Sequence, residues 1–504
     1  MPIRLSGMAS GLDTESIIKE MMSAQSLRKT NLEGKKEKLN WKKEKWEEVN
    51  TKVYAFYTDK LSSLKLQGSY QTKKVSSSDE SKVKATASNA VAGSYSLSVE
   101  KLASAEYVTG ADIKDKGYTK ETLLADTGME IGQTITIRTG KNLDNVVEYT
   151  IDDESTIGDL VNKLKDAGLN ANFDTASGRF YIAAKDTGEE NKFTVESNAT
   201  EGMGLEKLGL QNITRELAET GVTASNSSQI AVVAASDSKI QLNGAIINSS
   251  SNTIQTNGLT LELIGTTNSD GIKLSVSNDT DAVYDKVKEF VNSYNELLKD
   301  MYDKYNAPSA KGYSMLTSDQ KAAMSDEQVK LWEDKIKDSL LRRDDTLNDV
   351  MTLFRSAMQE TVEIDGEKFS LSSFGIVTGS YTEHGQLHIE GESSDALYAD
   401  KTNKLRSMLE SDPEKVGQAL SGILSKFYNK LSDKMSVSNL SSAFTLYNDK
   451  QMKTQSDEYE KQIKNWETKL QDMEDKYYKQ FSAMEKAMAS LQQKQSQLSG
   501  MLGM

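Results

Sequence analysis

The two histidines of the chain, His384 and His388, are the residues whose type and spacing come nearest to a metal site. A spacing of four places two imidazoles on one face of a helix, where they could bind zinc. Gly385 between them is a poor helix residue, however, and Leu387 and Ile389 alternate as in a strand. No third ligand is evident beyond the neighbouring glutamates. We therefore expect a strand here, without a metal.

An acidic triplet at residues 152–154 is the second candidate. Calcium binds such carboxylates, but the spacing does not fit an EF-hand loop, which needs a glycine at its sixth position. A solvated turn leading to a helix capped by Ser155 explains the triplet more simply. Residues 202–209, GMGLEKLG, lack the Lys-Ser or Lys-Thr of a phosphate-binding loop. We expect no catalytic, cofactor-binding or metal-binding residues, and a protein that is not an enzyme.

Length and composition limit the number of domains and the kinds of partner and site that are possible. The chain has 504 residues, of which 37% are hydrophobic and 27% charged, and its net charge is −14. This length predicts three or four domains, and the negative charge makes nucleic acid a poor general partner. The absence of cysteine excludes disulfides and thiolate metal sites. No stretch is apolar enough to insert into a membrane, and the first residues lack the apolar region of a cleaved signal peptide.

A long helix is predicted over residues 13–66. Asp13 is a suitable N-cap, with Leu12 and Ile17 as a hydrophobic staple. Apolar residues then form one stripe and continue at steps of seven. These residues are Ile17, Ile18, Met21 and Met22, then Leu32, Leu39, Trp46 and Val53. Residues 28–52 hold nine Lys or Arg and five Glu, so this helix is a weak coiled coil by itself.

A second long helix, over residues 450–500, has a stronger heptad seam with one stutter. The seam residues are Tyr459, Ile463, Trp466, Leu470, Met473 and Tyr477, then Phe481, Met484, Met488, Leu491, Gln495, Leu498 and Leu502. A helix with one apolar seam and charged flanks needs a partner helix. The N-terminal helix of the same chain, or the same helices of other subunits, could supply it. We hypothesise that the stripe from Ile17 to Met22 packs around Leu491, Leu498 and Leu502.

Between the helices the hydrophobic period changes to two. Alternating segments at 94–102, 134–140, 146–152, 179–184, 192–197, 239–244, 259–265 and 272–278 predict strands. Turn residues at 140–142, 177–178 and 243–244 separate them, and one short helix is predicted over 155–168. Residues 222–228 are rich in Ser, Thr and Asn and could divide the β-rich part into two modules. From residue 279 the pattern is helical again, apart from a short β element near 370–390.

The predicted fold class is therefore α+β and multidomain. Long helical coiled-coil termini and a helical leg flank a β-rich head of two modules. The expected domains are a terminal coiled coil (1–45 with 440–504), a helical leg (46–72 with 279–439), a head domain (73–105 with 229–278) and an inserted head domain (106–228).

Four segments carry a resemblance to a known family. They are GLDTESIIKEMM (11–22), EYTIDDESTIGDLVNKLKDAG with ANFDTASGRFYIAAKDTG (148–188), NDTDAVYDKVKEFVNSYNELL (278–298) and LWEDKIKDSLLRRDDTLN (331–348). In this order the chain resembles the bacterial flagellar filament cap proteins, the hook-associated cap family. The 148–188 segment is the least specific, because several flagellar proteins share such a repeat.

The resemblance implies a homo-oligomeric ring at the distal tip of the flagellar filament, outside the cell. It implies that flagellin subunits arrive through the flagellar type III export apparatus, fold beneath the cap and insert, and are not lost. It also implies export without a cleaved signal peptide, with an export chaperone as a further partner. The interface residues would be those of the two seams, from Leu12 to Trp46 and from Ile463 to Leu502.

Two other functions stay open at this point. Hook–filament junction proteins and flagellin itself also pair terminal helices, although they fit residues 11–22 and 331–348 less well. A host-surface adhesin that binds mucin through the head could coexist with capping. The head has few aromatic residues, so platforms for stacking sugars are not evident. An unexpected metal at His384 and His388 would reopen the enzyme hypothesis.

Overall fold

The computed structural model describes residue 11 and residues 13–501. The chain divides into two compact units. The first runs to Gln71 and resumes at Thr280, and the second is Thr72–Asp279. The predicted class is confirmed, because long terminal helices and a helical region belong to one unit and the β-rich modules to the other.

The N-terminal helix α1, Thr14–Ala55, begins where the sequence predicts. The Asp13 side chain accepts a hydrogen bond from the Ser16 amide at 3.0 Å, as an N-cap should. The helix continues through a π-helical turn, Phe56–Leu61, into α2, Ser62–Leu64. The predicted helix is therefore continuous, but its regular hydrogen-bond ladder shifts at Phe56. Such π turns are rare and often occur at functional sites.

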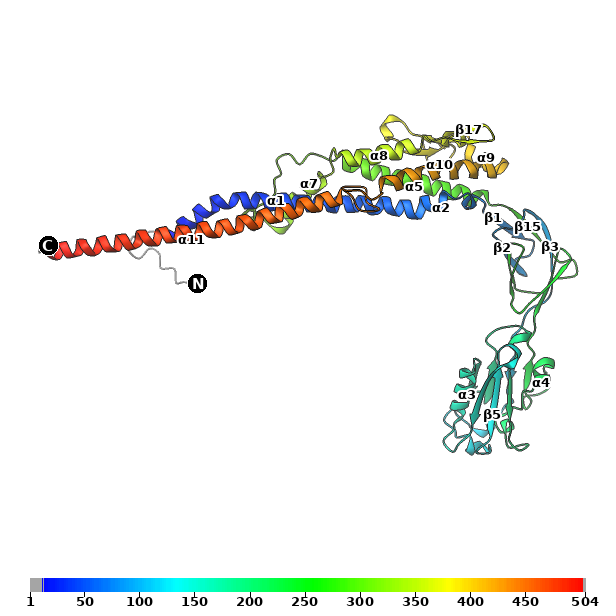
Figure 1. Ribbon diagram of the computed structural model, residues 1–504. Coiled ribbons are helices and arrows are strands. Elements are labelled where there is room, and N and C mark those ends of the chain that lie inside the picture. Colours follow the sequence, from blue (N-terminus) through cyan, green and yellow to red (C-terminus); the bar gives the residue numbers. More distant parts are fainter. Residues whose placement is uncertain (1–10, 12, 502–504) are drawn as a thin grey trace. The chain divides into compact units, whose positions relative to one another are not determined.

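The C-terminal helix α11, Asp449–Met501, lies beside α1 and antiparallel to it (Figure 1). The leg of the first unit is built from α5 (Thr280–Tyr305), α8 (Asp345–Ala357), α9 (Lys404–Ser411) and α10 (Pro413–Lys434). Two hairpins cover this leg, β16–β17 (Val362–Ile364, Glu367–Phe369) and β18–β19 (Ile376–Thr378, Leu387–Ile389). Between α5 and α8 lie α6 (Ser318–Ala322) and α7 (Asp326–Asp338).

The core of the leg is aromatic. Phe56, from the π turn, packs against three rings at centroid distances of 5.7 to 5.9 Å: Phe290, Phe354 and Phe427. All four side chains are buried. The end of the N-terminal helix is therefore fixed in the leg by buried aromatic area, which contributes more than helix propensity does.

The first module of the second unit holds two antiparallel sheets. One has the order β1-β15-β3-β11-β12 and the other β13-β14-β2. The strands are β1 Lys73–Ser77, β2 Val83–Ala87, β3 Gly93–Lys101, β11 Ser238–Leu242, β12 Ala245–Ser249, β13 Thr253–Thr256, β14 Leu259–Leu263 and β15 Ile272–Asn278. The turn between β11 and β12 is Asn243-Gly244, with φ of +48° and +86°, which is typical of a tight two-residue hairpin.

The inserted module also has two sheets, ordered β10-β4-β8-β7 and β6-β5-β9. Its strands are β4 Tyr107–Thr109, β5 Thr134–Thr139, β6 Asn145–Thr150, β7 Asn170–Asp174, β8 Arg179–Ala183, β9 Thr194–Ser197 and β10 Ala231–Val233. Helix α3 (Ile157–Asp166) packs on β7, and α4 is Arg215–Thr220. Because β10 pairs with β4, the chain returns to the first module after Val233.

The predicted cap of the short helix is wrong by one residue. Thr156, not Ser155, is the N-cap of α3, and its hydroxyl accepts from the Asp159 amide at 3.1 Å. The Asp159 carboxylate in turn accepts from the Thr156 amide, which completes a capping box. The Ser155 hydroxyl donates instead to Asp152 at 2.6 Å, so the acidic triplet is a turn, as expected. Gly168, with φ of +93°, ends the helix as predicted.

Candidate functional site: the paired terminal helices

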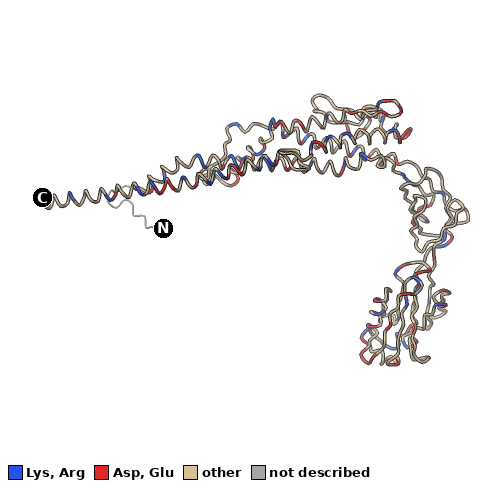
Figure 2. Tube along the Cα trace, in the orientation of Figure 1, with Lys and Arg blue, Asp and Glu red and all other residues tan. Residues whose placement is uncertain are grey.

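The register between α1 and α11 is defined by two ion pairs. Lys29 Nζ lies 3.0 Å from Glu467 Oε1, and Lys36 Nζ lies 3.0 Å from Glu460 Oε2. In both pairs the two residue numbers add up to 496, so a residue of α1 lies level with the α11 residue whose number is 496 minus its own. Figure 2 shows the two signs of charge interleaved along both helices. The same register places Thr14, the first residue of α1, level with residue 482, so that α11 continues for about 19 residues beyond it.

The seam that the sequence predicts on α11 faces inward but is never fully covered. No α11 side chain from 449 to 499 is fully buried. The half-buried seam residues are Tyr459, Ile463, Trp466, Leu470, Met473, Tyr477, Phe481, Met484 and Met488. One partner helix therefore covers only part of this apolar stripe.

On α1 the burial is uneven. Ile18 and Trp46 are 2% and 1% exposed, and Met22, Leu32 and Leu39 are half-buried. Ile17 and Met21 are 36% and 38% exposed. The first stripe therefore turns one edge toward the interior and leaves the other at the surface.

The hypothesised contact between the first stripe and the end of α11 is not made within the chain. Leu491 and Leu498 are 66% and 59% exposed. The ion-pair register places Ile18 level with Tyr478, more than three helical turns short of Leu491. Leu12 and Leu502 lie outside the described residues. The sequence could not predict this alignment, because the polar first half of the α1 heptads does not specify a register, and contacts outside the seams determine it.

A loop before α11 fastens it to the leg. Trp46 stacks on Tyr447 with ring centroids 5.5 Å apart. The Asn50 side chain accepts from the Leu446 amide at 2.9 Å and donates to the Phe444 carbonyl at 3.1 Å. The side-chain amide of Asn50 thus both accepts from and donates to the backbone of the loop, and this fixes where α11 starts.

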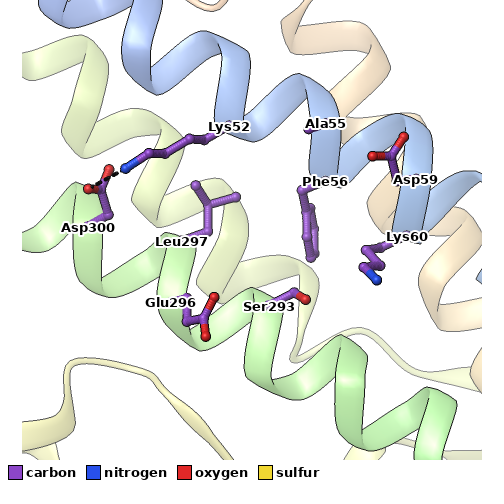
Figure 3. A pocket seen from close by; sticks show the side chains of 9 residues that line it. All are labelled: Lys52, Ala55, Phe56, Asp59, Lys60, Ser293, Glu296, Leu297 and Asp300. Atoms are coloured by element: carbon purple, nitrogen blue, oxygen red, sulfur yellow. Dashed lines mark hydrogen bonds and ion pairs between the residues drawn. The ribbon is translucent and has the colours of Figure 1, made fainter.

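A pocket of the leg lies between α1 with its π turn and α5 (Figure 3). Its volume is about 390 Å³, with Ala55, Phe56 and Leu297 as the apolar lining. On the rim, Asp300 accepts from Lys52 and Lys304, each at 2.8 Å. Burial raises the pKa of Asp300, but the two lysines outweigh it and lower the pKa below the usual value. The hydrogen bond between Lys52 and Asp300 at the rim joins α1 to α5.

Both histidines contact side chains of the leg. His388 lies in β19, in the expected strand, with Nδ1 2.5 Å from Asp395 Oδ2 and Nε2 3.1 Å from Glu383 Oε1. His384 ends a short helical turn and stacks on Tyr302 at 3.7 Å. Among residue 11 and residues 13–501, no group of three or more His, Asp or Glu side chains is arranged to hold a metal ion. No helix in the same described part is long and apolar enough to cross a membrane.

Comparison with known proteins agrees with this architecture. Two family profiles match: "Flagellar hook-associated protein 2 C-terminus" over residues 235–493 and "Flagellar hook-associated protein 2 N-terminus" over residues 10–106. The flagellar hook-associated protein 2 of Halalkalibacterium halodurans is 28% identical over 439 residues, which are 83% of this chain and 79% of that protein. The protein of the same name from Escherichia coli K12 is 23% identical over 420 residues, 82% and 81% of the two chains.

A solved structure shares the fold. The crystal structure of the D1-D2-D3 domains of the flagellar cap protein FliD from Escherichia coli superposes with a TM-score of 0.52 at 20% identity. The match covers 82% of this chain and 98% of that one. The resemblance to the filament cap family, inferred from four segments of sequence, is thereby confirmed. With one profile matching more than half of its residues, the chain belongs to the flagellar hook-associated protein 2 family.

Proposed function

We propose that the chain caps the distal tip of a bacterial flagellar filament as a structural, non-enzymatic protein. Copies of it form a homo-oligomeric ring outside the cell. The ring promotes the folding and insertion of flagellin delivered by the flagellar export apparatus and prevents the loss of these subunits. Its family supports the capping role, and the paired terminal helices support the manner of binding.

The observation that carries the proposal is the apolar stripe at the end of α11, which includes exposed leucines. Beyond residue 482, α11 has no part of α1 beside it, yet its apolar residues continue at heptad spacing. Met484 and Met488 are half-buried, and Leu491 and Leu498 are exposed. Exposed leucines at heptad spacing are typical of a helix that binds a further helix, and we take that helix to belong to another chain. At a filament tip that partner is a terminal helix of flagellin or of a second cap subunit.

The seam also suits a partner that changes. Each inserted flagellin replaces the one that the cap contacted before, so the binding surface must accept several packing arrangements. Methionine adapts its shape more easily than branched side chains do. When a partner helix leaves a half-covered seam, less apolar area is exposed to water than when it leaves a fully covered one. A fully buried, well-packed seam would instead hold one partner.

The proposal is tested in a strain that lacks the gene for this chain. We expect such a strain to release monomeric flagellin into the medium, and the intact gene to restore filaments. The double variant Leu491→Asp/Leu498→Asp should fail to restore them. Because both leucines are exposed, the purified variant should keep the melting temperature of the intact chain.

A matched control uses Gln493→Asp/Gln497→Asp, which adds the same charges to the same exposed end of α11 away from the seam. This control should restore filaments. Normal filaments with the leucine variant would contradict the role of α11, and normal filaments without the gene would contradict capping.

A further inference from the structure

Helix α7 forms a third helix beside the paired terminal helices (Figure 1). Ile336 of α7 packs on the buried ring of Trp41 in α1, together with Leu340 in the turn after α7. Lys337 Nζ lies 4.5 Å from the centroid of the same ring. The inner face of α7 is therefore fixed on α1 at the level of Trp41.

The loop before α7 is fitted closely to α1 as well. A Cβ at Gly34, in the middle of α1, would lie 3.1 Å from the Met315 Cβ. Glycine weakens a helix interior, so here it serves the close approach of the loop. Trp332 Nε1 donates to the Ser314 carbonyl at 2.8 Å, which joins α7 to this loop. The segment therefore presents the outer face of α7 in a defined orientation.

The outer face of α7 carries an acidic stripe with a leucine in it. The stripe consists of Glu327, Leu331, Asp334 and Asp338, at steps of four, three and four, on the side opposite Ile336. Leu331 is 60% exposed. Within the described residues the three carboxylates have no ion pair. Glu327 lies in the first turn of α7, where the helix dipole favours a negative charge, but Asp338 lies at the C-terminal end, where the dipole disfavours it. Asp338 therefore has no local benefit for α7.

A basic groove of about 350 Å³ lies where α1, α11 and the turn after α7 meet. Its lining residues are Lys35, Lys38, Leu39, Lys42, Ser339, Leu340, Gln455 and Tyr459. Lys42 pairs with Asp344 at 2.8 Å. Lys35 and Lys38 have no ion pair with any residue that the structure describes. The groove therefore combines two uncompensated positive charges with apolar side chains, the chemical complement of the stripe.

The stripe and the groove lie at the same level along α1. Helix α7 packs at Trp41, and the groove is lined by residues 35–42. Copies arranged around one axis are at equal heights, so two different patches can meet between neighbours only if their heights match. Here they match, and contact between unlike patches can continue around a closed ring.

We propose that the acidic stripe of α7 in one copy of this chain binds in the basic groove of the next copy. Leu331 enters the groove between Leu39 and Tyr459, and Asp334 and Asp338 face Lys35 and Lys38. This inference rests on the proposed function only in that copies of the chain assemble side by side. Because the charged groups stay near water, the association weakens as salt is added.

Cysteine cross-linking tests the contact without interference, because the chain has no cysteine of its own. Purified full-length Leu331→Cys and Ser339→Cys variants are oxidised alone and as a mixture. We expect a disulfide-linked pair in the mixture and little in either variant alone, since the two contacting patches differ. Lys461→Cys, exposed on α11 at the same height, replaces Ser339→Cys as the control. A mixture that cross-links no more than this control overturns the proposal.

Charge reversal is an independent test. Lys35→Glu/Lys38→Glu and Asp334→Lys/Asp338→Lys should each shift the purified protein to smaller species in light scattering. The four substitutions together should recover at least half of the assembled fraction. The matched control is Lys461→Glu/Lys464→Glu, an exposed pair with the same spacing, which should assemble as the intact chain does. Unchanged assembly of both reversed variants, or no recovery in the combination, overturns the contact.

These outcomes are separate from those of the capping test. A cross-link that forms in a chain unable to support filaments would reject the capping function and support the contact. Normal filaments from the charge-reversed variants, without a cross-link, would reject the contact and leave capping intact.

Discussion

At the scale of single residues, Glu106 is the carboxyl group in the least favourable surroundings. Its side chain is buried, with one oxygen accepting from the Phe193 amide at 2.7 Å and the other without a partner. Burial raises the pKa of Glu106 from 4.5 to about 8, against the opposing effects of that amide and of Lys192. The folded state therefore keeps a proton that the unfolded state loses above pH 4.5. Stability is full below that pH and falls as the pH rises toward 8.

We expect Glu106→Gln to be more stable than the intact chain at pH 8. The amide keeps the shape of the protonated acid and cannot ionise, so the variant gains roughly 1–3 kcal/mol at pH 8 and much less at pH 4.5. Thermal unfolding followed by circular dichroism at both pH values measures this. An equal effect at the two pH values would show that ionisation of Glu106 is not the cause.

Glu392 is the opposite case. Burial raises the pKa of its carboxyl group, but hydrogen bonds from Lys288, Ser394 and Tyr284 outweigh burial and lower the pKa to about 2. The Lys288 Nζ and Tyr284 hydroxyl distances are 2.9 and 2.7 Å. The ionised carboxylate therefore stabilises the leg above pH 4.5, and this contribution is lost as the pH falls toward 2.

Glu392→Gln should destabilise the leg at pH 7 by roughly 1–3 kcal/mol, because the charge-assisted hydrogen bonds are lost. The difference from the intact chain should shrink steadily below pH 4. Denaturant titration at pH 7 and pH 3 compares the two, with Glu363→Gln in the exposed part of β16 as the control. A difference that stays constant with pH would contradict the assignment.

At the scale of elements, α1 and α11 differ in how they are held. The second half of α1 is part of the core of the leg through Trp46, Val49 and Val53, and the π turn after it adds Phe56. Helix α11 has only half-buried seam residues beyond its first turn. The leg half of α1 therefore contributes to the core of the leg, whereas most of α11 keeps much of its apolar side exposed.

Two tryptophans distinguish these roles. Trp46→Ala should cost about 3–5 kcal/mol, as expected for a fully buried aromatic side chain. Trp466→Ala should cost clearly less, because the Trp466 side chain is half-buried against one helix and lies near the Arg28 guanidinium at the surface. Urea unfolding of the two variants measures both. Similar losses would mean that the α11 seam is more tightly packed in solution than one partner helix allows.

The sequence predicts the elements better than it predicts how they meet. All eight alternating segments are strands, and both long helices lie where their seams indicate. Missed strands such as β7, NANFD, and β12, AIINS, are short or polar, and become strands only through pairing with a neighbour. The packing of α7 on Trp41 could not be predicted, because it produces no hydrophobic periodicity in the sequence. The site could be predicted as two seams. Their register could not, because it depends on contacts outside the seams: the ion pairs of Lys29 and Lys36, and the packing of Trp46 and Asn50 against the loop before α11.

At the scale of the whole molecule, the second unit is closed on itself. Its first strand, β1, pairs with its last, β15, and the Asp279 amide donates to the Thr72 carbonyl at 2.8 Å. Its two ends are therefore neighbours, and its modules have cores of their own. The terminal helices contribute to neither core.

We expect residues 72–279 to fold as a separate fragment. The fragment should unfold cooperatively, and its amide resonances should match those of the same residues in a chain without residues 1–25. Scanning calorimetry and two-dimensional NMR compare them. A fragment without dispersed resonances would show that the first unit is needed to fold the second.

The charge of the inserted module bears on the adhesin hypothesis. Residues 103–236 hold 22 Asp or Glu and 12 Lys or Arg, a net charge of −10, whereas the rest of the second unit is balanced. Sialylated or sulfated mucin chains are polyanions, so this module repels them over distances that grow as salt is removed. The fragment 72–279 should therefore not bind immobilised mucin, and lowering the salt should not produce binding. Neutral glycans serve as the control, since the field of the module does not act on them. Binding to mucin that strengthens at low salt would contradict this prediction and would favour an adhesin.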